Sequence, residues 1–335
     1  MRKLLIATIL GITGFALGAS SATADPLKIR AGWSNTPTAM APLIFSKPEL
    51  LKHYGKSYTM EPVHFAGSAP EITALATGDL DIATLAASSL ASAIENARMT
   101  DIRVIGDENQ DGIEGWYSSQ FFVLKDSPIK TVTDLKGKVL ASNAIGGGLD
   151  VSIRAMLRKN KIDDKREVTI IEGNFATLVP MLEEHKADLV AAVPPFSFIA
   201  EKKGTVRTLF TSRDAVGPSE FIFDAARKPF IDKNRAALVD FHEDWIRSLR
   251  WFLDPANHDA AVKIIADYTK LPPAGLQDWV FTHKDLYRDP DHRPNLKALQ
   301  ANLDIQQQLG IQKTHIDVAQ YADTSLVDEA AKRIK

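Results

Sequence analysis

Short apolar stretches that alternate with helical stretches constrain the fold of this chain more than any other feature. The first part of the chain predicts strands at 27–33, 58–65, 81–85 and 102–105, with helices at 68–78 and 89–97 between them. A β-α-β-α-β order of this kind predicts a mostly parallel sheet with helices on its faces.

The same alternation restarts after residue 119. Strands are expected at 120–124, 138–142, 168–171, 188–192 and 206–211. The segments 75–83 and 182–190 resemble each other, since each ends a helix and introduces a short apolar strand through an acidic residue. We therefore expect two α/β lobes of similar plan, although a common βα rhythm alone also produces such an echo. The chain after 234 is expected to be helical and to pack on the first lobe.

The N-terminus has the layout of a secretory leader. Arg2 and Lys3 precede an apolar run at 4–17, and small residues lead to an A-x-A pattern that ends at Ala24. The alternative, a membrane anchor, is disfavoured because the run is shorter than the roughly 20 residues that span a bilayer. Cleavage after Ala24 would leave 311 of the 335 residues in an exported protein, without access to cytoplasmic ATP or reduced nicotinamide.

Composition limits the partners and the compartment. The net charge is −2, and loss of the two basic leader residues makes it more negative, so neither nucleic acid nor an anionic membrane surface is favoured as a partner. The chain has no cysteine, which excludes disulfides and the lipid anchor of bacterial lipoproteins. We expect a free protein in the periplasm of a Gram-negative cell.

Motifs of common enzyme classes are missing from the sequence. Its eight histidines form no H-E-x-x-H pair, and the chain has neither a G-x-S-x-G elbow nor a P-loop. We expect no catalytic residues, no metal ligands and no cofactor, although residues distant in sequence can still assemble in space.

Small, polar and aromatic residues follow the predicted strands. Ser68 is expected to cap a helix, with Glu71 reaching back to it, and the glycines at 146–148 open another helix whose free N–H groups favour an anion. Asp150 would occupy part of that positive end. Because ligands of open α/β sheets bind beyond the carboxyl ends of the strands, we predict a ligand-binding cleft. Its candidate residues are Trp33, Ser34, Ser68, Ser88, Asn143, Gly147, Asp150, Asn174 and Phe196.

Five segments of the chain resemble a known family. They are 27–33 (LKIRAGW), 65–71 (FAGSAPE), 74–83 (ALATGDLDIA), 131–139 (TVTDLKGKV) and the glycines that follow Asn143. In this order they resemble the periplasmic solute-binding proteins of ABC importers for sulfonates, taurine, nitrate and thiamine-precursor pyrimidines. The resemblance is clear over residues 27–224.

The resemblance implies a two-lobed clamp of the Venus flytrap type (type II). One lobe would comprise 25–119 plus 220–335 with the helical tail, the other 125–215, and crossings would lie at 120–124 and 216–219. A small solute would close the clamp, and the monomer would then dock on an inner-membrane permease that works with an ATPase subunit.

The ligand and the alternatives follow from the same residues. The resemblance implies that strong anions such as nitrate or alkyl sulfonates often bind through an arginine, and no arginine lies in the candidate loops. Trp33, Trp116, Tyr117 and Phe196 instead offer ring faces to a flat organic ligand. Among small organic solutes we expect a sulfonate, a taurine-like compound or a nitrogen-containing aromatic compound. An exported enzyme, or a pyrimidine-precursor enzyme of the same fold, is the alternative function. Those relatives depend on cysteine and histidine chemistry. A receptor partner of a membrane sensor is a third possibility.

Overall fold

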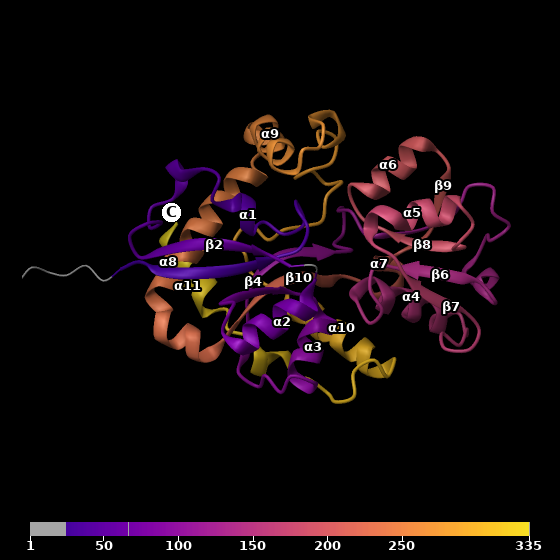
Figure 1. The fold of residues 1–335 in the computed structure, drawn as a ribbon, viewed down its shortest axis with the longest axis horizontal. Coiled ribbons are helices and arrows are strands. Elements are labelled where there is room, and N and C mark those ends of the chain that lie inside the picture. Colours follow the sequence, from indigo (N-terminus) through magenta and orange to yellow (C-terminus); the bar gives the residue numbers. More distant parts are fainter. Residues whose placement is uncertain (1–24, 66, 335) are drawn as a thin grey trace, which may run out of the picture.

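The computed structural model describes residues 25–65 and 67–334, and the predicted leader at 1–24 lies outside this part of the chain. The described chain forms two five-stranded sheets, each with helices on its faces (Figure 1). This arrangement confirms the predicted α/β class.

The first sheet has the strand order β2-β1-β3-β10-β4. Its strands are β1 (Leu27–Trp33), β2 (Tyr58–His64), β3 (Ile82–Leu85), β4 (Ile102–Asp111) and β10 (Ser219–Arg227). β1 is parallel to β2 and β3, whereas β10 is antiparallel to its neighbours β3 and β4. The sheet is therefore mixed, with four strands that run in one direction.

The second sheet repeats this plan in the order β7-β6-β8-β5-β9. Its strands are β5 (Gln120–Leu124), β6 (Val139–Ser142), β7 (Thr169–Glu172), β8 (Leu189–Ala192) and β9 (Val206–Thr211). β5 is antiparallel to β8 and β9, and it takes the position that β10 has in the first sheet. The two similar sequence segments, 75–83 and 182–190, lead into β3 and β8, which occupy equivalent positions in the two sheets.

Eleven α-helices are described. They are α1 (Ala41–Ile44), α2 (Ser68–Thr77), α3 (Ala87–Glu95), α4 (Gly148–Lys159), α5 (Phe175–Glu183), α6 (Phe196–Lys203), α7 (Ser212–Val216), α8 (Lys228–Leu253), α9 (His258–Thr269), α10 (Leu296–Gln308) and α11 (Ser325–Arg333). Short 3₁₀ turns lie at Pro48–Leu50, Val132–Leu135, Pro255–Asn257, Pro273–Gly275 and Val318–Tyr321. Within the described residues, no helix combines the length and the apolar character that a bilayer crossing requires.

Helices cover both faces of the first sheet. On one face, Ile29 of β1 belongs to a core with Trp245 and Phe241 of α8, and on the other, Leu85 of β3 belongs to a core with Leu90 of α3 and Leu299 of α10. The C-terminal helices α8 and α10 thus pack on the first sheet, as expected for the chain after 234. Apolar residues of β5, β6 and β8 form a separate core in the second sheet.

Two chain segments connect the sheets, 112–119 between β4 and β5 and 212–218 between β9 and β10. They are joined to each other, because Ser212 N donates to Ser119 O at 2.8 Å. The buried Asp111 carboxylate accepts from Ser118 Oγ at 2.6 Å and from Ser119 N at 3.1 Å. Of the predicted crossings, residues 120–124 form strand β5, and Ser219 is the first residue of β10. The predicted lobe boundaries stay a prediction.

Candidate functional site

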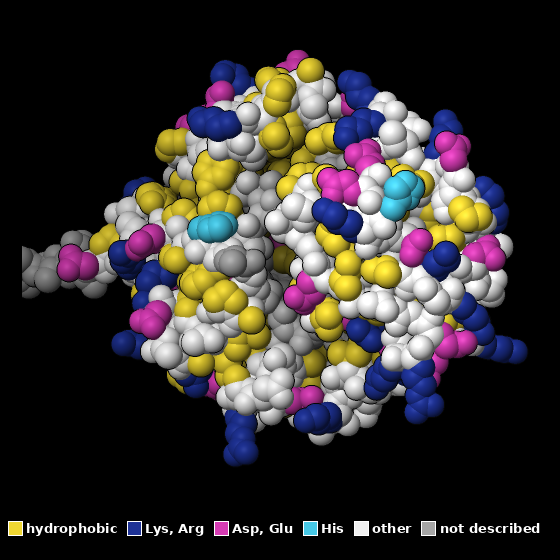
Figure 2. Space-filling model, turned by 45° about the vertical axis from the view of Figure 1, so that its right-hand side comes forward, with side chains coloured by type: hydrophobic (Ala, Val, Ile, Leu, Met, Phe, Trp, Pro, Cys, Tyr) yellow, Lys and Arg dark blue, Asp and Glu magenta, His cyan; other side chains and the backbone are white. Residues whose placement is uncertain are grey.

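The carboxyl ends of the central strands lie where helices begin. In the first sheet, β1 ends at Trp33 and β3 ends just before α3. In the second sheet, β6 ends at Ser142 before the glycine loop, and β8 ends shortly before α6. A space-filling view shows a hollow between the two halves of the molecule, with hydrophobic side chains along one rim (Figure 2).

Contacts across the connecting segments bring parts of the two halves together. The Tyr117 hydroxyl lies 3.3 Å from Ala192 O at the end of β8 and 3.0 Å from Ser197 Oγ of α6. Phe198 of α6 lies 5.4 Å from Trp279, measured between ring centroids. The loop that follows β8 is therefore held against the crossing segment and against the C-terminal part of the chain.

The first-lobe candidates lie on three neighbouring loops. Trp33 is half-buried and Ser34 is exposed directly after β1, Ser68 is the first residue of α2, and Ser88 lies in the first turn of α3. The predicted capping pair is wrong, because Gly67 occupies the cap position and no side chain caps this helix. The Ser68 hydroxyl instead donates to Thr84 O at 3.4 Å.

Glu71 is not a capping residue because its side chain points into the interior. It is fully buried, and its Oε2 accepts from Thr84 N at 2.6 Å. A Cβ atom on Gly32 would lie only 3.0 Å from Glu71 Cδ, so glycine is needed at this point of β1. Burial, reinforced by the charge of Asp224, raises the pKa of Glu71 to about 8, although the Thr84 hydrogen bond opposes this shift.

The second-lobe candidates differ in their burial and in the hydrogen bonds that their side chains already make within the protein. Asn143 and Phe196 are half-buried, and Gly147 is the cap residue of α4. Asn174 caps α5 by accepting from Thr177 N at 3.1 Å. Asp150 is fully buried, and its Oδ2 accepts from Gly146 N and from Arg154 Nε, both at 2.8 Å. Asp150 therefore holds the glycine loop in shape.

Four of the described helices begin at this edge without a side-chain cap. The cap residues are Gly67 for α2, Ala86 for α3, Gly147 for α4 and Pro195 for α6, and none provides a capping side chain. By contrast, Asn174 caps α5 and Thr211 caps α7. The first N–H groups of an uncapped helix are free to bind a ligand, and they favour an anion.

An aromatic cluster lies at the carboxyl ends of β1 and β2. The Trp33 ring is 4.6 Å from the His64 ring and 5.9 Å from the Tyr268 ring, in edge-to-face arrangements. Tyr268 is 42% exposed, which is unusual for a large hydrophobic side chain in this structure. Sequence reasoning missed His64 and Tyr268. His64 directly precedes the 65–71 segment and could have been found from it. Tyr268 lies in the helical tail, where no sequence motif points to a ligand site.

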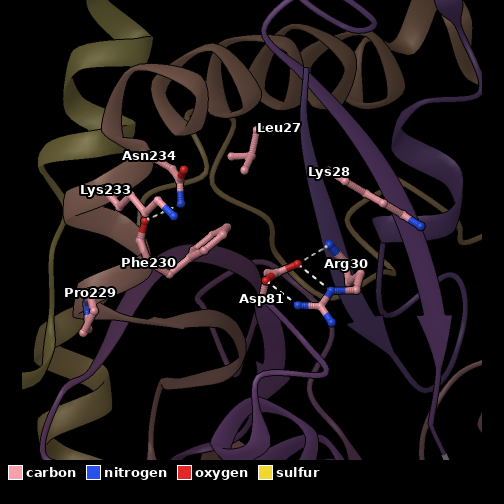
Figure 3. A pocket seen from close by; sticks show the side chains of 8 residues that line it. All are labelled: Leu27, Lys28, Arg30, Asp81, Pro229, Phe230, Lys233 and Asn234. Carbon is pink, nitrogen blue, oxygen red and sulfur yellow. Dashed lines mark hydrogen bonds and ion pairs between the residues drawn. The ribbon is translucent and has the colours of Figure 1, made fainter. Parts of the chain in front are cut away.

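A separate surface cavity of about 700 Å³ lies at the opposite end of β1 (Figure 3). Leu27, Pro229 and Phe230 provide its apolar lining. Arg30 is engaged here in a two-pronged ion pair, with its Nε and Nη2 donating to Asp81 at 2.8 Å. This cavity lies at the amino end of the strand and is distinct from the candidate site.

Solved structures share this fold. The alkanesulfonate-binding protein SsuA from Xanthomonas axonopodis pv. citri, bound to MOPS, is 18% identical, with a TM-score of 0.69 over 90% of this chain and 99% of that chain. The periplasmic nitrate-binding protein NrtA from Synechocystis PCC 6803 is 16% identical, with a TM-score of 0.72 over 92% of this chain and 89% of that chain. The desulfurization enzyme DSZB is 12% identical, with a TM-score of 0.67 over 92% of this chain and 100% of that chain.

These likenesses confirm the predicted two-lobed binding-protein fold and, at such identities, establish the fold alone. No curated protein matches the chain. The model of the NMT1-like family matches residues 22–266, which include all five segments that carried the sequence resemblance. Since this match spans well over half of the chain, the protein belongs to the NMT1-like family.

Proposed function

We propose that the protein is the periplasmic substrate-binding component of an ABC importer. It would capture a small organic solute between its two lobes and deliver it to a membrane permease. The observation that carries this proposal is that uncapped helix N-termini and an aromatic cluster follow the carboxyl ends of strands in both of the joined sheets. A ligand that contacts both lobes favours the closed form.

The same features favour an organic anion as the solute. The N–H groups at the starts of α2, α3 and α4 suit a sulfonate or carboxylate head group. Trp33, His64 and Tyr268 offer ring faces and edges to an apolar or aromatic body. Of the predicted ligand contacts, Trp33, Ser34, Ser68, Ser88, Asn143, Gly147, Asn174 and Phe196 are retained, and Asp150 is assigned to support of the loop.

Ligand capture can be tested by titrating the mature protein with sulfonates, taurine-like compounds and aromatic nitrogen compounds. We expect one compound class to quench tryptophan fluorescence and to raise the melting temperature, since ligand at 100 times Kd adds about 2.7 kcal/mol of stability. Solution scattering should show compaction with the same compound. A folded protein that responds to none of these compounds would contradict the proposal.

Trp33→Ala should weaken the binding of that compound about tenfold, since about 1.4 kcal/mol of ring contact would be lost. Trp251→Ala is the matched control, because Trp251 packs on Phe252 and under Lys47 in another part of the first lobe. Isothermal titration of both variants gives the two dissociation constants. Equal affinities would remove Trp33 from the site.

The likeness to a desulfurization enzyme keeps an exported enzyme as the second candidate function. Because the chain has no cysteine, any covalent mechanism of such an enzyme would use a nucleophile other than a thiolate. Product formation from the bound compound, followed by mass spectrometry, would favour this candidate over a carrier that releases its solute unchanged.

A further inference from the structure

We propose that His53, Asp240 and Glu243 form a binding site for a divalent transition metal of the zinc type. His53 lies in the segment between the Pro48–Leu50 turn and β2, and the two carboxylates lie three residues apart on α8. One ligand atom from each of the three side chains lies within 4.8 Å of the other two. The residues are almost 190 positions apart in sequence, so no spacing motif predicts the site.

The backbone around His53 is fixed to α8 by the next acidic residue of that helix. Asp244 is fully buried, and its carboxylate accepts from Lys52 N at 2.8 Å and from His53 N at 2.9 Å. The Tyr58 hydroxyl donates to the same carboxylate at 3.0 Å. The imidazole is thus held beside Asp240 and Glu243 by contacts that do not involve its ring.

Each ligating carboxylate uses one oxygen for an arginine and turns the other toward His53. Arg333 Nη1 donates to Asp240 Oδ1 at 3.0 Å, and Arg247 Nη2 donates to Glu243 Oε1 at 2.5 Å. Of the remaining oxygens, Glu243 Oε2 lies 3.2 Å from His53 Nε2, and Asp240 Oδ2 lies 3.7 Å from the other ring nitrogen, Nδ1. Because one ion binds only one ring nitrogen, Nε2 is the ligand that we assign. Hydrogen bonds of this kind orient metal-binding carboxylates in known sites.

The His53 ring nitrogen near Glu243 is placed as a metal ligand would be. Nε2 is enclosed by protein and has no hydrogen-bond partner, although Glu243 Oε2 lies only 3.2 Å away. The carboxylate oxygen therefore lies out of line for a hydrogen bond. Two ligands of one tetrahedral zinc ion, each about 2.0–2.1 Å from the metal, lie about 3.3 Å apart, which agrees with this spacing.

The donor set selects the class of metal. One imidazole and two carboxylates suit Zn²⁺, whereas Ca²⁺ and Mg²⁺ prefer oxygen ligands only. The His53 side chain is 27% exposed, so water can reach the cluster and supply the fourth ligand of a tetrahedral site.

Calorimetric titration of the untagged, chelator-treated mature protein with ZnCl₂ tests this site. We expect one Zn²⁺ per chain, loss of binding in His53→Ala, and at least tenfold weaker binding in Asp240→Asn, which keeps an oxygen for Arg333. His315→Ala is the matched control, because this histidine is also paired with an aspartate, Asp304, at 3.7 Å. Its binding should equal that of the unchanged protein.

Co²⁺ gives an independent readout, because its visible spectrum reports ligand geometry. The unchanged protein and His315→Ala should show tetrahedral-type absorption, and His53→Ala should not. The proposal is overturned if the unchanged protein binds no Zn²⁺, if folded Asp240→Asn binds as well as the unchanged protein, or if His315→Ala loses binding to the same extent as His53→Ala.

Discussion

Replacing Gly106 with alanine should destabilise the protein by about 3 kcal/mol or more, the upper end of the range for overpacked interiors. Gly106 lies in β4 opposite Asp224 of β10. A Cβ atom at this position would lie 2.6 Å from Cε1 and 2.7 Å from Cδ2 of His292, and closer still to Nε2. Real carbon atoms do not approach so closely, so either the ring or the strand has to move.

The His292 ring cannot move aside without breaking other contacts. It is fully buried and stacks on Trp245, with 4.9 Å between ring centroids. Its Nδ1 donates to Asp107 O at 2.5 Å, and Asp107 N donates back to His292 O at 2.9 Å. The substitution therefore strains the sheet, and a glycine in a strand interior commonly marks such a close approach.

Thermal unfolding of Gly106→Ala should show a melting temperature about 5–10 °C lower. Gly275→Ala is the control, because no atom lies within 4 Å of a Cβ atom there and its backbone is not left-handed. In a His292→Ala background, Gly106→Ala should cost much less, since the colliding ring is gone. Equal costs in the two backgrounds would show that the ring is not the cause.

The polar end of β4 shows where sequence reasoning fails on the fold. The hydrophobic pattern predicted a strand that ends near Ile105, whereas β4 continues to Asp111 through five buried polar residues. These residues stay in the strand because they find partners far away in sequence: Met40 N donates to Glu108 at 2.9 Å, and Asn109 donates to Thr38 O at 2.9 Å. A local pattern contains no information on such partners. By contrast, β1, β5 and β9 follow the expected ranges because their own apolar residues already indicate a strand.

The candidate site could likewise be predicted from the sequence only in part. The positions of Trp33 and of the helix starts could be predicted, since they follow from where strands end. The uses of Asp150 and Glu71 could not, because both carboxylates are buried and bind main-chain N–H groups that only the folded chain brings to them. Tyr268 also joins the site only through tertiary packing, because α9 lies in the tail that the sequence described only as helical.

Glu71→Gln should make the stability of the protein less dependent on pH. The pKa of Glu71 is raised from its ordinary value of 4.5 to about 8, first because the carboxyl group is buried and then because Asp224 lies nearby. The folded chain therefore holds a proton on Glu71 at pH 7, and the unfolded chain does not. In that state the carboxyl still accepts from Thr84 N at 2.6 Å.

The sign of the effect follows from proton linkage. Below pH 4.5 Glu71 is protonated in both states, so this residue contributes no pH dependence. As the pH rises from 4.5 to about 8, the unfolded state loses its proton first, and the free energy of unfolding falls. A shift of this size corresponds to a loss of about 5 kcal/mol by pH 8.5, and glutamine removes it because an amide does not titrate.

Denaturant unfolding of both proteins at pH 5, 7 and 8.5 measures this difference. At pH 5 the variant should be less stable by about 1–2 kcal/mol, because one amide N–H group is buried where Glu71 Oε1 has no partner. At pH 8.5 the order should reverse, because the unchanged protein has lost the stability that protonated Glu71 provides. Other buried acids with raised pKa values, such as Asp107 and Glu220, titrate equally in both proteins and do not affect the comparison. Glu114→Gln, at an exposed position, should show no such reversal. A constant difference across this pH range would mean that Glu71 does not change its protonation on folding, and that its burial is compensated by contacts with the ionised carboxylate.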